Sequence, residues 1–282
     1  MTRVLISGCG DLGTEVGLLL AAGGNEVFGL RRDPGVLPPQ IRPVAGDLTA
    51  DDGLADVPTD VDLLVHTPTA GGRDPARYAA VYRDGMARLL ERLTAAGDPP
   101  RRTLFVSSTT VYGDTDGGWV DEDTPTNPAS ATGEQIVAAE RVLLDADVDG
   151  VVLRLAGIYG PGRTHLIDQV RRGEAVRPDP PRHANRIHRD DAARAVVHLL
   201  ARDEVAPVYL GVDSAPVDRG EVIAFLAEEL GRPLPPTGPA GGRGGDKRCR
   251  NDRLVASGFT FRYPTYREGY RAVLAGEGVR HP

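Results

Sequence analysis

Three glycines near the start of the chain have the spacing of a loop that binds a dinucleotide. Gly8, Gly10 and Gly13 follow the apolar run Arg3–Ser7, and a segment with helical character, Thr14–Ala22, comes directly after them. In such a loop the first glycine permits a tight turn, the second lets the backbone approach a pyrophosphate, and the third lets helix and strand pack closely. The stretch therefore predicts a nucleotide site at a helix N-terminus, although a glycine turn in another α/β fold remains the alternative.

The residues after the second predicted strand, Glu26–Leu30, indicate which cofactor is bound. An acidic residue at this place binds the ribose 2′-hydroxyl of NAD, whereas this chain has Arg31 and Arg32. Because guanidinium groups suit a 2′-phosphate, the sequence favours NADP as the cofactor. Asp33 follows immediately and keeps NAD possible, and two solvated surface arginines are the other interpretation.

Strands that alternate with helices over the first 155 residues predict how these groups are positioned. The predicted strands are Arg3–Ser7, Glu26–Leu30, Ile41–Ala45, Val61–His66, Thr103–Ser107 and Val151–Leu155, and the predicted helices are Thr14–Ala22, Pro75–Ala96 and Gly133–Asp145. This alternation is typical of an α/β fold with a doubly wound parallel sheet, the Rossmann arrangement. Such sheets bind ligands at the carboxyl ends of their strands.

In the second half of the chain the regular alternation of strands and helices gives way to shorter predicted elements. We expect residues 1–160 to form the dinucleotide-binding core and residues 161–282 to form mainly a small substrate-binding cap, with elements that return to the core sheet. A segment rich in proline and glycine, Pro233–Asp246, predicts a mobile loop. The other predicted elements of this half are Asp190–Arg202, Val208–Val212, Arg219–Leu230 and a helix within Asn251–Ala275.

Composition argues against several classes of protein. The 282 residues carry a net charge of −7, which argues against binding to nucleic acid or to an anionic membrane. No run approaches the roughly 18 apolar residues of a membrane span. The two cysteines fit neither a disulfide framework nor a zinc pattern, and the acidic segment 114–123 reads as a solvated loop rather than a metal site. We therefore expect a cytoplasmic protein without a metal that acts on a small molecule.

Several motifs together resemble the extended short-chain dehydrogenases/reductases of the NAD-dependent epimerase/dehydratase type, as an atypical member. The resemblance covers nearly the whole chain and rests on the glycine loop and on Val106–Gly113, Arg154–Gly162 and Ile187–Ala192. It implies adenine contacts from Asp47 and Leu48, substrate contacts from Asn185, Arg186 and His188, and a homodimer through two long helices. The cofactor residues that complete the set are Asp11, Leu12, Thr67, Pro68 and Gly157.

The catalytic pair of that family, Tyr-x-x-x-Lys, is absent. In the family the tyrosine moves a proton, and the lysine lowers the pKa of the tyrosine and holds the nicotinamide ribose. In the matching register Thr132 replaces the tyrosine and Ile136 replaces the lysine. Lys247 is the only lysine, and the residue four before it is an arginine, so no such pair occurs anywhere in the chain.

Ser108 keeps the substrate-binding hydroxyl of the family, and Tyr82 and Tyr112 are phenols expected near the nicotinamide. Our hypothesis is that one of these tyrosines donates the proton beside Ser108, while two packed side chains are an equally compatible interpretation. Two functions stay open. One is an NAD(P)-dependent oxidoreductase or epimerase that acts on a small hydroxy, carbonyl or sugar-type compound. The other is a non-catalytic NADP(H)-binding sensor or scaffold.

Overall fold

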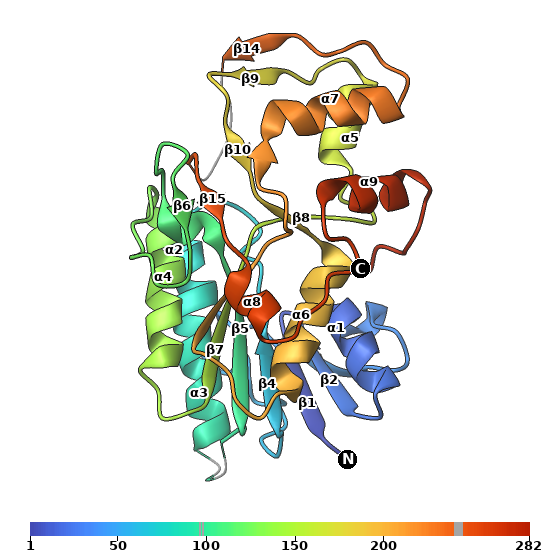
Figure 1. Ribbon diagram of the computed structural model, residues 1–282. Coiled ribbons are helices and arrows are strands. Elements are labelled where there is room, and N and C mark those ends of the chain that lie inside the picture. Colours follow the sequence, from blue (N-terminus) through green and yellow to red (C-terminus); the bar gives the residue numbers. More distant parts are fainter. Residues whose placement is uncertain (96, 98, 240–244) are drawn as a thin grey trace.

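A seven-stranded sheet forms the centre of the computed structural model, which describes residues 1–95, 97, 99–239 and 245–282 (Figure 1). The strand order is β12-β7-β5-β4-β1-β2-β3, and every neighbouring pair is parallel. The strands are β1 (Arg3–Ser7), β2 (Glu26–Arg31), β3 (Arg42–Ala45), β4 (Leu63–His66), β5 (Arg102–Ser108), β7 (Gly150–Leu155) and β12 (Val208–Gly211). The predicted doubly wound parallel sheet is thus confirmed. Its order reverses between β1 and β4, which is where such sheets bind ligands.

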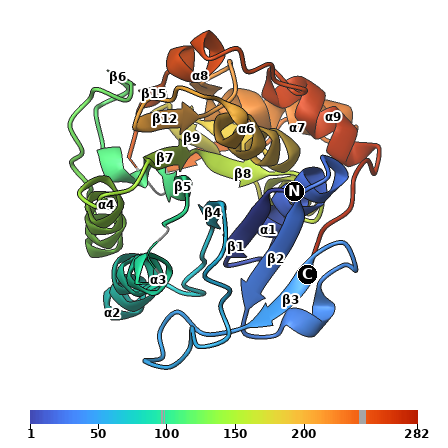
Figure 2. The ribbon, with the colours of Figure 1, turned by 90° about the horizontal axis from the view of Figure 1, so that it is seen from below.

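Helices cover both faces of this sheet (Figure 2). On one face lie α1 (Asp11–Ala22) and α6 (Arg189–Ala201), and on the other lie α3 (Gly85–Thr94) and α4 (Ala131–Leu144). Successive side chains of β1 point to opposite faces of the sheet. Val4 and Ile6 therefore join the apolar cluster under α1 and α6, and Leu5 joins the cluster under α3 and α4. Because the strands are buried on both faces, their sequences are nearly continuous apolar runs.

The long helix predicted over Pro75–Ala96 is interrupted. Pro75–Tyr78 forms α2, residues 79–84 form a π-helical stretch, and α3 continues to Thr94, while Ala96 lies outside the described residues. Periodicity alone cannot separate these pieces, because all of them have nearly helical side-chain spacing. The π-helical stretch carries Tyr82, a residue that the sequence singled out.

The carboxyl ends of the strands are covered by a cap (Figure 1). Its apolar centre joins α5 (His165–Arg171), α7 (Arg219–Glu229) and α9 (Tyr266–Leu274) through buried residues such as Ile167, Val222 and Tyr270. Within 161–282, β12 and α6 return to the core. The remaining elements are β6 (Trp119–Val120), β8 (Gly157–Tyr159), β9 (Arg177–Asp179), β10 (His183–Ala184), β11 (Arg186–His188), β13 (Val217–Asp218), β14 (Thr237–Pro239), β15 (Arg248–Cys249), α8 (Asp252–Ala256) and two short 3₁₀ turns, Pro34–Val36 and Thr109–Tyr112.

The segment Pro233–Asp246 differs from the predicted loop. Residues 240–244 of it lie outside the described residues, but Thr237–Pro239 forms a strand that pairs with β9. Pairing across the chain supplies hydrogen bonds that a local proline-rich and glycine-rich pattern does not reveal. Across the described residues, none of the helices has the length and apolar character needed to span a membrane.

Candidate functional site

The glycine loop between β1 and α1 has the geometry that its sequence predicts. Gly8 has φ +80°, and a Cβ at this position would lie 2.6 Å from the Cα of Pro68. A Cβ at Gly13 would lie 2.9 Å from the hydroxyl oxygen of Thr67. The backbone N–H groups of Gly8 and Cys9 both donate to the carbonyl of Leu30 at 3.0 Å, which fixes the loop against β2. Larger side chains at the two glycines would displace backbone or β-strand neighbours.

A pocket of about 880 Å³ opens beside this loop, at the point where the strand order reverses. It has the size and position of a site for the adenosine half of a dinucleotide. Many residues predicted to bind cofactor line it, namely Gly8, Gly10, Arg31, Arg32, Asp47, Leu48 and Pro68. Arg77, which the sequence analysis missed, also lines it from α2. No local pattern marks Arg77, because the fold alone brings α2 to this pocket.

Positive charge gathers in this pocket. Arg31 donates through Nη1 to the carbonyl oxygens of Cys9 and Pro282, each at 3.1 Å. Hydrogen bonds from the backbone and hydroxyl of Thr49 lower the pKa of Asp47, and the charges of Arg32 and Arg77 lower it further. The pocket therefore presents arginines together with an ionised carboxylate.

A smaller pocket of about 200 Å³ continues from the first and shares Gly8, Gly10 and Pro68 with it. Predicted residues that line it are Asp11, Leu12, Gly13, Thr67 and Tyr82. It also includes Val106, Ser107, Ile158 and Arg163, none of which was predicted. Gly157 is an exposed residue of β8 directly before Ile158. Both pockets therefore lie along the glycine loop.

The phenol of Tyr82 is part of this smaller pocket. Its hydroxyl donates to the carbonyl of Pro68 at 3.2 Å. Burial, and to a lesser extent the neighbouring Tyr78, raise the pKa of Tyr82 to about 12. Tyr82 is therefore a neutral hydroxyl near pH 7 that reaches the predicted cofactor site.

Tyr112 lies in a different environment, because its side chain is only 2% exposed. Its hydroxyl donates to the carbonyl of Asp121 at 2.6 Å and accepts from Nη1 of Arg154 at 2.7 Å. Arg154 in turn forms a buried ion pair with Glu140 at 2.7 Å. Burial raises the pKa of Tyr112 well above its usual range, although the charge of Arg154 acts in the opposite direction. The structure thus ties Tyr112 into a buried polar network.

The hydroxyls of Ser108 and Thr132 make local contacts. Ser108 accepts hydrogen bonds from the backbone and hydroxyl of Thr110 at 3.2 and 3.0 Å, and so caps the turn that follows β5. The hydroxyl oxygen of Thr132 lies 3.1 Å from that of Ser130. Ile136, which the predicted register places at the position of the family's lysine, is buried in the apolar cluster under α4. Neither hydroxyl has a cation beside it in these contacts.

Three predicted substrate residues lie where the cap meets the core. Asn185 uses both ends of its amide on the backbone at β15, donating to the carbonyl of Lys247, which directly precedes the strand, and accepting from the N–H of Cys249, each at 2.8 Å. His188 accepts from the N–H of Asp190 through Nδ1, and burial lowers the pKa of His188 below its usual range. Asn185 therefore has a clear structural role, and its predicted contact with substrate stays a prediction.

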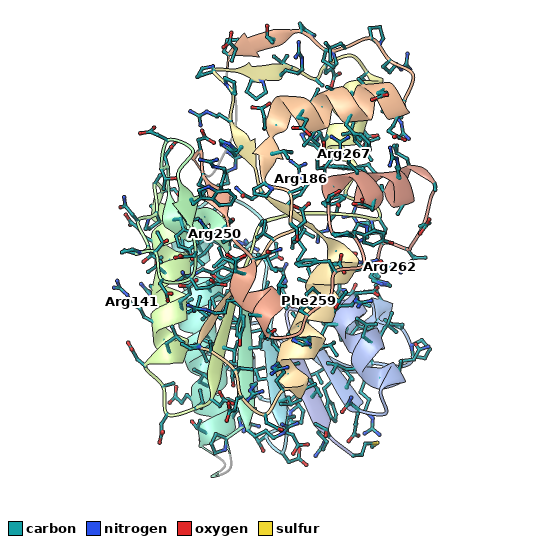
Figure 3. All side chains as sticks on the ribbon, viewed as in Figure 1. Arg141, Arg186, Arg250, Phe259, Arg262 and Arg267 are labelled. Carbon is teal, nitrogen blue, oxygen red and sulfur yellow. The ribbon has the colours of Figure 1, made fainter. Side chains whose placement is uncertain are left out.

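Arg186 is the remaining member of this group, and Figure 3 shows it below α7 near Arg267. Its guanidinium carbon lies 5.4 Å from the ring centre of Tyr266 and 6.0 Å from that of Tyr270. Buried nitrogens of two side chains, Nη1 of Arg186 and Nε2 of His188, have no hydrogen-bond partner among the described residues. Such atoms usually meet a ligand or an ordered water. In the described part of the chain, no group of three or more His, Cys, Asp or Glu side chains is arranged to hold a metal ion.

Comparison with known proteins gives consistent results. A solved structure from Methylobacillus flagellatus, described as an NAD-dependent epimerase/dehydratase, is 35% identical with a TM-score of 0.84, and the match covers 98% of each chain. Protein YeeZ of Escherichia coli (strain K12) is 30% identical over 275 residues, which cover 94% of this chain and 97% of YeeZ. A 3-diazoavenalumate denitrifying reductase from a Streptomyces species is 29% identical over 261 residues, 84% of each chain.

The sequence profile of the NAD dependent epimerase/dehydratase family matches residues 4–210, a stretch that contains the glycine loop, Val106–Gly113 and the segment around His188. The matched stretch includes the glycine loop along which the two pockets lie. The chain belongs to the NAD-dependent epimerase/dehydratase family.

Proposed function

We propose that this protein is an NADP(H)-dependent reductase of a small carbonyl or similarly electrophilic compound, with Tyr82 as the proton donor. The observation that supports the proposal is the position of Tyr82, a protonated phenol that lines the smaller pocket, which shares lining residues with the larger pocket that we assign to the adenosine half of the cofactor. The bound cofactor would supply a hydride to the substrate carbon. Tyr82 would give its proton to the substrate oxygen, so that a carbonyl and the hydride become an alcohol.

The preference for reduction follows from the acid–base state of Tyr82. Oxidation of an alcohol, and an epimerisation that begins with it, need a phenolate to remove the hydroxyl proton. Burial raises the pKa of Tyr82 to about 12, so the phenolate is scarce near neutral pH. The groups that shift the pKa of Tyr82 do not include Lys247, whose buried ammonium group donates to the carbonyl of Gly113 at 2.8 Å. The similarity to a denitrifying reductase is in keeping with the reductive direction.

The preference for NADP is supported by the charges of the larger pocket. Arg31, Arg32 and Arg77 line it, and guanidinium groups bind a 2′-phosphate through charge-assisted hydrogen bonds. Asp33 also lines it and keeps NAD as the alternative cofactor. For the substrate we propose Arg186 and His188 as contacts, because each has a buried nitrogen without a hydrogen-bond partner among the described residues. Arg186 would favour a substrate with a negatively charged group.

The test combines binding with turnover. Calorimetric titration of the full chain should give a clear preference for NADPH over NADH. A panel of aldehydes, ketones and conjugated electrophiles, some with a carboxylate, should then include compounds that consume NADPH. A protein that binds both redox forms of the cofactor and turns over no compound in the panel would instead support the sensor function. One observation favours the sensor function: the hydroxyl of Tyr112 is engaged in buried hydrogen bonds, so one of the two candidate proton donors is lost.

A further inference from the structure

Asp11 is the first residue of α1, beside the place where the glycine loop would receive a pyrophosphate. A carboxylate at this position repels an anionic ligand unless cations neutralise it. Its Oδ1 accepts from Nη1 of Arg189 at 3.0 Å and from the N–H of His281 at 3.1 Å, and its Oδ2 accepts from Nε of Arg163 at 2.8 Å. Burial raises the pKa of Asp11, but the hydrogen bonds and the two arginine charges outweigh this effect and lower it. Asp11 is thus ionised and held between two arginines.

Arg189 and Arg163 differ in how many of their hydrogen-bond donors are already used within the protein. Arg189 is 1% exposed and fully engaged, because it also donates to Asp190 at 2.7 Å and to the carbonyl of Val279 at 2.9 Å. The side chain of Arg163 is 36% exposed and contacts Asp11 through Nε. Its terminal nitrogens have no hydrogen-bond partner among the described residues, and Arg163 lines the smaller pocket together with Gly10 and Leu12.

The turn that carries Arg163 is held firmly. The N–H of Arg163 donates to the carbonyl of Gly160 at 3.0 Å, and Arg280 donates to the carbonyl of Gly162 at 3.2 Å. Asp11 fixes the guanidinium from the side of α1. Arg163 is therefore a preorganised cation at the wall of the smaller pocket. It comes from the second half of the chain, residues 161–282.

We propose that Arg163 binds the cofactor pyrophosphate with its terminal nitrogens, in the pocket that it lines together with the glycine loop. This inference rests on the proposed function, since it needs a dinucleotide at this loop. A guanidinium is well suited to the role, because it forms paired hydrogen bonds with phosphate oxygens. Residues from both halves of the chain would then enclose the pyrophosphate, and cofactor binding would secure the turn 160–163 against the core.

The experiment compares Arg163→Gln with wild type in calorimetric titrations of NADPH, NADH, ADP and adenosine. We expect about a tenfold or larger loss of affinity for the three ligands that contain a pyrophosphate, by similar factors, and unchanged affinity for adenosine. Arg163→Lys should lose less, because it keeps the charge but not the paired geometry. Arg171→Gln is the matched control, since Arg171 pairs with Asp168 in α5 and lines neither pocket of the site.

A double variant, Asp11→Asn with Arg163→Gln, separates direct contact from neutralisation of Asp11. If Arg163 touches the pyrophosphate, the double variant stays weak. Recovery of wild-type affinity in the double variant, or unchanged ADP binding in Arg163→Gln, would overturn the inference while wild-type NADPH binding keeps the proposed function intact. Wild-type protein that binds none of the nucleotides would overturn both proposals. Thermal unfolding of each variant confirms that the titrated protein is folded.

Discussion

The hydroxyl of Tyr82 donates a hydrogen bond to the carbonyl of Pro68 at 3.2 Å, so this phenol is attached to the loop that also packs against Gly8. Since Pro68 lines both pockets, the proposed proton donor and the proposed cofactor site share one piece of backbone. Tyr112, by contrast, is attached to Arg154 and Asp121 in the interior. Sequence analysis left open which of the two tyrosines donates the proton, and the structure gives them different surroundings.

Replacing Tyr82 with Phe should reduce turnover of a carbonyl substrate by about a hundredfold or more, because general acid catalysis typically contributes this much. NADPH affinity should change by no more than a few fold, since the phenyl ring stays in place. Steady-state kinetics and cofactor titration on the same preparation measure both effects. Tyr112→Phe is the comparison, and it should keep its turnover. Equal turnover in Tyr82→Phe and wild type would remove Tyr82 from the mechanism.

The pH dependence of reduction should show the raised pKa of Tyr82. The protonated phenol is the active form, and a pKa of about 12 keeps it protonated through neutral and moderately alkaline pH. We therefore expect kcat for reduction to stay level up to about pH 10 and to fall only as pH approaches that pKa. Stopped-flow measurements at high pH can follow this before the protein unfolds. A decline centred near neutral pH would point to another acid.

Replacing Arg31 with Ala should weaken NADPH binding by about ten- to a hundredfold and leave NADH binding nearly unchanged, because only NADPH carries the 2′-phosphate. The same selectivity is expected for Arg32→Ala. Titrations of both cofactors against each variant give the ratio directly. A parallel loss of NADH affinity would assign these arginines a structural role in the loop instead.

Replacing Glu140 with Gln should destabilise the protein by about 3–5 kcal/mol, because it leaves the buried guanidinium of Arg154 without its charged partner. The hydroxyl of Ser107, which donates to Glu140 at 2.5 Å, would also lose its ionised acceptor. Denaturant unfolding measures the change. Glu134→Gln, at an exposed position in the first turn of the same helix, is the control and should stay within about 0.5 kcal/mol of wild type. Similar stability of the two variants would contradict this account.

Local sequence was sufficient for the parallel sheet and for the glycine loop. Strand β1 has the predicted bounds, Arg3–Ser7, because a short apolar run that ends at glycines has few other structures available. Gly8 and Gly13 serve backbone requirements within one strand, turn and helix, which a short pattern captures. The absence of Tyr-x-x-x-Lys is likewise a property of spacing along the chain, so it needed no structure.

The side chains that meet at the site depend on the tertiary structure, because they come from segments far apart in the chain. Arg77 joins Arg31 and Arg32, and Arg163 joins Asp11, only when the sheet brings their loops to one edge. The π-helical stretch that holds Tyr82 and the network that holds Tyr112 result from packing against neighbours, which no periodicity records. Sequence by itself determined the fold and the missing catalytic pair, whereas long-range packing decided which hydroxyl and which arginines line the pockets.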